Sequence, residues 1–191
     1  METTSQIANE HDVSKETEPV TNYLITPMEI DDTESVHELL HASHRDTYVN
    51  EALGITAEKV DERFCRSTLE ERRAKTEKRI SDPNNQAYLA KDDEQNVIGF
   101  VAPRIEDDGT RRLGALYVRK EWHGKGVARA LMAKALDWLD GEHYDVKLGV
   151  ATYNERAKAF YRKYGFEEVL GSETMFDDYV PEVAMVRKAQ K

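Results

Sequence analysis

Leu113-Gly-Ala-Leu-Tyr-Val-Arg-Lys-Glu-Trp-His-Gly-Lys-Gly-Val-Ala-Arg-Ala-Leu-Met132 is the stretch that decides the fold, because its hydrophobic period changes partway along. Residues 113–118 are a short run rich in aliphatic and aromatic side chains, which predicts a strand. Further on, apolar residues recur at the spacing of one helix face, at Ala128, Leu131, Met132, Ala135, Leu136 and Leu139. The stretch is therefore predicted to be a strand, a turn and an amphipathic helix.

The turn between this strand and this helix has few bulky side chains. His123-Gly-Lys-Gly-Val-Ala128 contains two glycines and an alanine, so its backbone N–H groups can approach a ligand closely. The first turn of the helix adds unpaired N–H groups and the positive end of the helix dipole. Together these features predict an anion site, most often one for phosphate. A turn that only needs room or a positive φ would explain the glycines equally well.

Two familiar phosphate motifs do not fit this turn. A P-loop requires Gly-Lys followed by Ser or Thr, whereas Lys125 is followed by Gly126. A dinucleotide-binding fold needs a third small residue in register and an early βαβ unit, whereas this turn comes late in the chain, after a predicted β-meander. Both classes are therefore disfavoured.

Composition narrows the class of protein. The 191 residues suit one domain with a proper core, and Cys65, the only cysteine, excludes an intrachain disulfide. The formal charge of −10 argues against a nucleic-acid partner, because phosphate backbones need clustered Lys and Arg. We see no secretory signal and no apolar run long enough to span a bilayer. We therefore expect a cytoplasmic protein without a membrane partner, either a monomer or a homodimer.

The first half of the chain is predicted to be a tail followed by helices. Residues 1–21 are polar, acidic and aperiodic, which predicts a disordered tail, and residues 22–188 are expected to form the folded domain. The predicted elements are a strand over 23–26, a helix from 33, an irregular segment over 46–54, a helix from Thr56 and a charged helix over 67–80.

Three histidines flank the helix that begins near residue 33, whose buried side chains are expected to be Val36, Leu39, Leu40 and Ser43. His37, His41 and His44 recur at helical spacing, which raises a metal hypothesis. No carboxylate or cysteine completes a ligand set nearby, so these histidines are expected to be solvated and no metal is predicted.

The second half alternates strands and helices. Strands are predicted over 86–91, 97–105, 111–118, 146–150, 166–170 and within 178–186, with helices over 128–140 and 154–164. The second of these helices lies in Asn154-Glu-Arg-Ala-Lys-Ala-Phe-Tyr-Arg-Lys-Tyr-Gly-Phe166, where Asn154 is expected to be the N-cap.

This segment, the glycine turn and the order of elements together resemble the GCN5-related N-acetyltransferase (GNAT) superfamily over about residues 22–188. That family carries Gln/Arg-x-x-Gly-x-Gly/Ala after its fourth strand, and here His123 stands where Gln or Arg is usual. The resemblance implies an α+β fold with α/β/α layers, in which helices flank a mixed, mostly antiparallel sheet of six to seven strands. Stretches 115–118, 148–150 and 172–179 are also similar to the spermidine/spermine-acetylating group.

The resemblance further implies acetyl-CoA as co-substrate, in a cleft where the fourth and fifth strands splay apart. Backbone groups of Leu116 and Val118 would hold the pantetheine, and one of these amides would polarise the thioester carbonyl. The turn amides would hold the pyrophosphate. The residues implied at this co-substrate are Leu116, Tyr117, Val118, His123, Gly124, Lys125, Gly126, Val127, Ala128, Arg129, Asn154, Ala157 and Tyr161.

The resemblance also suggests the reacting groups. Tyr161 is implied as the acid that protonates the departing thiolate, although an aromatic residue on a helix is also ordinary core. Many relatives carry a Glu where Arg112 stands, so the base is open and Glu106 is the fallback. Asp46 and Tyr48 lie, with His44, where an acceptor loop is expected, and would suit a cationic amine.

The function expected from this resemblance is an N-acetyltransferase acting on a small amine or polyamine by direct attack in a ternary complex. A protein N-terminal amine or a lysine is the alternative acceptor. A coenzyme-binding module that has lost catalysis and acts as a sensor or partner domain is a different class. A structural protein without a ligand would leave the glycine turn and Tyr161 unexplained.

Overall fold

The computed structural model describes residues 22–190, so the tail predicted over 1–21 lies outside the described residues. The strands are β1 (Tyr23–Pro27), β2 (Tyr88–Asp92), β3 (Val97–Ile105), β4 (Arg111–Val118), β5 (Val146–Ala151), β6 (Phe166–Glu168), β7 (Thr174–Phe176) and β8 (Val180–Arg187). The α-helices are α1 (Thr33–Tyr48), α2 (Ala57–Cys65), α3 (Leu69–Ser81), α4 (Val127–Trp138) and α5 (Glu155–Arg162). Short 3-10 turns are η1 (Ile30–Asp32), η2 (Glu51–Leu53) and η3 (Lys120–Trp122).

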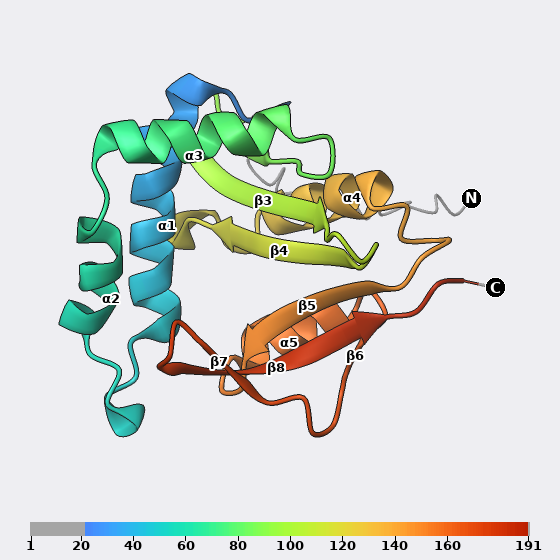
Figure 1. The fold of residues 1–191 in the computed structure, drawn as a ribbon. Helices are drawn as coiled ribbons and strands as arrows, with labels where there is room; N and C mark the ends of the chain where they lie inside the picture. Colours follow the sequence, from blue (N-terminus) through green and yellow to red (C-terminus); the bar gives the residue numbers. More distant parts are fainter. Residues whose placement is uncertain (1–21, 191) are drawn as a thin grey trace, which may run out of the picture.

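All eight strands belong to one sheet, in the order β1-β2-β3-β4-β5-β8-β6, with β7 paired to β8 (Figure 1). Every pair is antiparallel except β4 with β5, which confirms the mixed, mostly antiparallel sheet. The sheet has more strands than the six to seven expected. The three-residue strand β7 was not predicted, because so short a segment shows no hydrophobic period.

Helices cover both faces of the sheet, which confirms the layered architecture. The largest buried cluster joins α4 to the strands through Val127, Leu131 and Met132, and it also holds Tyr161 of α5. On the opposite face, α1 packs Val36 and Leu39 against β2 and β3. Helices α2 and α3 contact α1 (Figure 1). The sheet therefore separates an α4/α5 face from an α1 face.

Helix α1 continues through residues that were predicted to be irregular, because it ends only at Tyr48. Its buried side chains include Tyr48 and His44, which is 4 % exposed, so the expectation that His44 is solvated was wrong. The sequence nevertheless contains a pattern that predicts the burial of His44. Val36, Leu40, His44 and Tyr48 recur every fourth residue, which is the stripe of a buried helix face.

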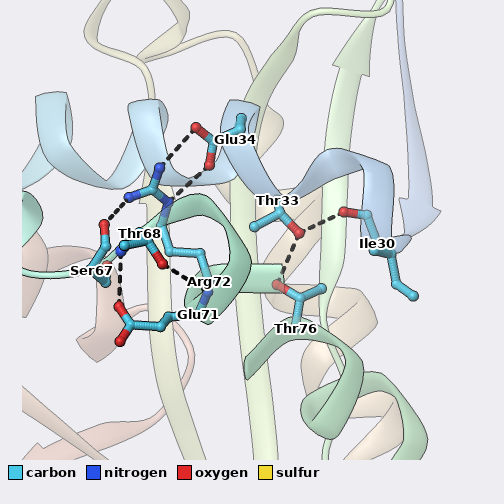
Figure 2. A network of polar contacts seen from close by, with 8 residues as sticks. All are labelled: Ile30, Thr33, Glu34, Ser67, Thr68, Glu71, Arg72 and Thr76. Atoms are coloured by element: carbon cyan, nitrogen blue, oxygen red, sulfur yellow. Dashed lines mark hydrogen bonds and ion pairs between the residues drawn. The ribbon is translucent and has the colours of Figure 1, made fainter. Parts of the chain in front are cut away.

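A polar network fixes α3 against the start of α1 (Figure 2). The Thr33 hydroxyl donates to the Ile30 carbonyl and accepts a hydrogen bond from the Thr76 hydroxyl, 3.1 Å away in a buried contact. The Arg72 guanidinium donates to both carboxylate oxygens of Glu34, each at 2.9 Å. At its own N-terminus α3 carries a capping box between Thr68 and Glu71. The charged helix is thus attached by specific bonds, since its only buried residue is Thr76.

Candidate active site

Strands β4 and β5 pair only at their N-terminal ends, at Arg111↔Val146 and Arg112↔Lys147. Beyond those pairs the two parallel strands diverge, as Figure 1 shows toward the left of its view. A cavity of about 510 Å³ lies at this opening. Its lining includes every residue that the sequence implied at the co-substrate except Lys125, and it also includes Asp46 and Tyr48.

The turn that leads into α4 has the backbone of an anion site. Gly124 and Gly126 adopt φ values of 81° and 85°, and an added Cβ at Gly124 would meet no atom within 4 Å. Gly126 is the N-cap of α4 and supplies no side-chain cap. Within residues 22–190 the backbone amides of Gly124, Gly126, Val127, Ala128 and Arg129 have no hydrogen-bond acceptor. The glycines therefore allow the turn conformation and leave these five amides free for an anion.

Lys125 differs from its neighbours in this turn. Its ammonium lies over the ring of Trp122, 4.8 Å from the centroid, and the residue does not line the cavity. Lys125 is therefore the one residue implied at the co-substrate that does not line the cavity. Arg129, one turn into α4, does line the cavity.

The pairing of β4 directs two backbone amides toward the opening. Tyr117 pairs with Phe100 of β3, and the Arg119 amide donates to the Ile98 carbonyl at 2.9 Å. Bonds alternate along an antiparallel pair, so the amides of Leu116 and Val118 point away from β3 and toward β5. These are the two residues whose backbone was expected to meet the pantetheine.

Two polar side chains that line the cavity, His123 and Asn154, are held by hydrogen bonds. Arg156 donates to His123 Nδ1 at 2.8 Å, and because Arg has no acceptor, His123 donates from Nε2 to the Val118 carbonyl at 3.0 Å. The Asn154 Oδ1 accepts from the Ala157 amide at 3.0 Å, which confirms Asn154 as the N-cap of α5. Its amide nitrogen stays available, so the cap and a ligand contact can coexist.

Tyr161 occupies the wall formed by α5. It lines the cavity, and its side chain is buried in the core cluster. Burial raises the pKa of the Tyr161 phenol well above its ordinary value, and nearby Tyr117 and Glu182 raise it further. The phenol therefore keeps its proton, as a general acid requires.

Aromatic rings form the wall on the α1 face. The hydroxyl groups of Tyr48 and Tyr117 are 2.8 Å apart, and burial raises the pKa of Tyr117 to about 12. The His44 ring lies 4.8 Å from that of Tyr48 and 5.0 Å from that of Tyr117. Phe176 of β7 also lines the cavity. A neutral, rigid aromatic surface thus faces the opening from this side.

The carboxylates near the opening differ from expectation. Glu106 accepts from Arg112 at 2.8 Å and from Arg104 at 3.0 Å, and these bonds, Arg112 first, lower the pKa of Glu106. It does not line the cavity. Glu182 of β8 does line it, and burial raises the pKa of this carboxyl. Glu182 therefore lines the cavity together with Asp46, whereas Glu106 does not.

Sequence reasoning missed Glu182 because its place depends on topology. The residue pairs with Ala151 across β5 and β8, which brings it beside a strand far earlier in the chain. Its neighbours in the sequence, Pro181 and Val183, carry no catalytic pattern. No local signal could have found it.

The part of the chain that the structure describes shows neither a metal-binding cluster nor a membrane-spanning helix. Within residues 22–190, no three or more His, Cys, Asp or Glu side chains gather in a way that would hold a metal ion. Across the same residues, every helix is too short or too polar for a membrane crossing.

Known proteins share both sequence and fold with this chain. The model of the acetyltransferase (GNAT) family matches residues 36–166. An uncharacterised N-acetyltransferase of Mycobacterium tuberculosis is 36% identical over 92 residues, which cover 46% of this chain and 56% of that protein. N-acetylaspartate synthetase of Homo sapiens is 35% identical over 80 residues, which cover 41% of this chain and 26% of that protein. The chain thus spans about half the length of the mycobacterial relative that it matches.

Solved structures agree on the fold. PaiA N-acetyltransferase from Thermoplasma acidophilum, in complex with coenzyme A, gives a TM-score of 0.70 at 21% identity, over 87% of this chain and 99% of that chain. A variant of the spermidine N-acetyltransferase SpeG from Vibrio cholerae gives 0.63 at 22% identity, over 88% of this chain and 94% of that chain. With a family match over more than half of its residues, the chain belongs to the acetyltransferase (GNAT) family.

Proposed function

We propose that the chain transfers an acetyl group from acetyl-CoA to the primary amine of a small molecule, by direct attack in a ternary complex. The observation that carries the proposal is the continuity of one cavity. It joins the free amides of the glycine turn to Tyr161 and, across the opened sheet, to Glu182. Family membership supports the reaction type, and a relative in complex with coenzyme A supports the co-substrate.

The residues of the cavity fit coenzyme A. The amides of Gly124 and of residues 126–129 would bind the pyrophosphate, since they have no acceptor within residues 22–190. The amides of Leu116 and Val118 would meet the pantetheine and thioester. Acetyl-CoA, when bound, supplies an activated acetyl group. A strand amide there would donate to the carbonyl oxygen as negative charge develops on it.

Two proton transfers complete the proposed reaction. Tyr161 would give its proton to the departing sulfur, because its raised pKa keeps the phenol protonated. The attacking ammonium must first lose a proton, and Glu182 would accept it directly or through water. A carboxyl with a raised pKa is a better base than Glu106, whose bonds to two guanidinium groups stabilise its ionised form.

Several relatives support an amine acceptor without identifying it. SpeG is named as a spermidine N-acetyltransferase, which accords with the expected polyamine, and N-acetylaspartate synthetase is named for an N-acetylated small amine. A peptide N-terminus or lysine is the alternative acceptor. A coenzyme-binding module without catalysis is the second candidate function, because Arg112 stands where a catalytic Glu was expected.

The test is thiol release from acetyl-CoA by the full chain, measured across polyamines, amino acids and peptides. Turnover with at least one amine is expected. The acceptor with the highest kcat/KM shows which class of amine the protein prefers. Binding of coenzyme A without turnover on any amine would instead favour the non-catalytic module.

A matched pair of variants tests the role of Tyr161. Tyr161→Phe should lower kcat by about 100-fold, as expected for loss of a general acid, while the Kd for coenzyme A holds. Tyr164→Phe removes the same hydroxyl from a residue that does not line the cavity, so its kcat should stay at the wild-type level. Equal rates for the two variants would refute the acid assignment.

A further inference from the structure

Two glycines lie just beyond the point where β4 and β5 stop pairing. Arg112↔Lys147 is the last pair, and Gly114 and Gly149 follow two residues later on each strand. An added Cβ at Gly114 would lie 2.9 Å from Arg104 Nη1, and one at Gly149 would lie 2.6 Å from Glu182 Oε2. An added Cβ at Gly114 would also lie 2.9 Å from the Ala102 carbonyl oxygen, so Gly114 makes room for both the β3 backbone and Arg104, whereas Gly149 makes room for Glu182.

The two charged groups belong to opposite walls of the same cavity. Arg104 pairs with Arg112 across β3 and β4, and both side chains line the cavity. They share one carboxylate, Glu106, so two positive charges and one negative charge leave this wall with one net positive charge. Arg104 and Arg112 keep 43% and 31% of their side chains exposed, so the pair is accessible to a ligand.

The β8 wall carries a single carboxylate, Glu182, and the other carboxylate of the lining, Asp46, lies on α1. Glu182 forms no ion pair within residues 22–190, although Arg112 is near enough to lower its pKa against the raising effect of burial. Glu182 and Arg112 thus face one cavity without touching each other, which leaves space between a negative and a positive wall.

We propose that the acceptor is an aminocarboxylate, whose carboxylate binds the guanidinium groups of Arg104 and Arg112 while its amine faces Glu182. This inference rests on the proposed acetyl transfer and names the substrate class. Guanidinium groups bind carboxylates through paired N–H bonds, and one net positive charge matches one carboxylate better than a dianionic phosphate. A polyamine would instead place its second ammonium against two guanidinium groups, which is a repulsive arrangement.

The experiment measures acceptor binding, so that it does not depend on turnover. Isothermal titration calorimetry is run on the full chain saturated with coenzyme A, which cannot donate an acetyl group. The ligands are the standard amino acids, each beside its α-amide and its decarboxylated amine, together with spermidine and phosphoethanolamine. At least one amino acid should bind at least about 10-fold more tightly than its amide, because the amide lacks the carboxylate that makes the charge-assisted bond. The inference would be overturned if every amino acid bound with the same affinity as its amide and its decarboxylated amine. It would also be overturned if spermidine or phosphoethanolamine bound more tightly than every amino acid.

A neighbouring arginine supplies the matched control. Arg112→Gln should weaken binding of the preferred amino acid by about 10- to 100-fold and leave its amide unaffected. Arg111→Gln removes the same charge one residue away, but Arg111 lies over the ring of Tyr144, 3.7 Å from its centroid, and does not line the cavity. The affinity of Arg111→Gln for the preferred amino acid should match that of wild type. Equal losses in the two variants would refute a carboxylate site, and Arg104→Gln repeats the test if Arg112→Gln lowers the melting temperature.

Failure of this inference and failure of the proposed function give different results. If thiol release proceeds with amines that lack a carboxylate, at the same KM in wild type and Arg112→Gln, acetyl transfer stands and the aminocarboxylate site is refuted. If amino acids bind with the expected dependence on Arg112 but no amine is acetylated, the binding site stands and the proposed reaction is refuted.

Discussion

The stability of the protein should fall in mild acid because of one buried imidazole, His44. Its side chain lies among the rings of Tyr48, Phe64 and Tyr117, and it is 4 % exposed. Its Nδ1 atom has no hydrogen-bond partner within residues 22–190. Burial lowers the pKa of His44 from 6.5 to about 3, with smaller contributions from Arg63 and His41. The folded protein therefore holds this imidazole neutral.

The size and sign of the effect follow from that difference. Between pH 6.5 and about 3 the unfolded chain binds a proton at His44 that the folded chain does not, so the free energy of unfolding falls as pH falls. The loss is about 1.4 kcal/mol for each pH unit below 6.5. At pH 5 it is about 2 kcal/mol relative to pH 8, a large share of the stability of a typical domain.

The assay is urea unfolding of wild type and His44→Phe at several pH values between 8 and 5. A phenyl ring fills the same aromatic site and removes an unpaired nitrogen, so this variant should be at least as stable at pH 8 and should gain about 2 kcal/mol over wild type by pH 5. His143→Asn is a control of opposite sign, because the hydrogen bond that the His143 ring donates to the Asp140 carboxylate raises the pKa of this exposed histidine. A constant stability difference between wild type and His44→Phe across this range would refute the buried neutral imidazole.

Two further substitutions test the packing around the site. Thr76→Val keeps the side-chain size but removes the hydroxyl that donates to Thr33, and should lower the free energy of unfolding by about 1 kcal/mol in urea titrations; an unchanged value would show that this bond does not secure α3. Gly149→Ala places a Cβ 2.6 Å from the Glu182 carboxylate and must displace it, so KM for the acceptor should rise while calorimetry finds the same Kd for coenzyme A. An unchanged KM would remove Glu182 from the acceptor site.

The coenzyme half of the site could be predicted because its signals are local. The turn from His123 to Ala128 and the cap at Asn154 depend on residues next to one another, and the structure has both features where they were expected. The helix predicted from Thr56 is present as α2, and its buried residues Val60 and Phe64 lie four positions apart within that one helix.

The acceptor half could not be predicted because it depends on contacts between distant strands. Arg104 and Arg112 become neighbours only through the register of β3 and β4, and Glu182 joins them only because β8 pairs with β5. Glu106 was a reasonable choice from its position in the meander. The two arginines that bind it could be identified only from the folded structure.

Calorimetric titration of coenzyme A tests the central claim, that the turn between β4 and α4 binds the pyrophosphate. Gly126→Glu puts a carboxylate among the free amides and should abolish binding. Gly54→Glu makes the same change at a glycine of similar positive φ, 67°, with no atom within 4 Å of an added Cβ, and should bind as wild type does. Loss of binding in Gly126→Glu alone is the predicted result. Wild-type affinity in Gly126→Glu would contradict the account.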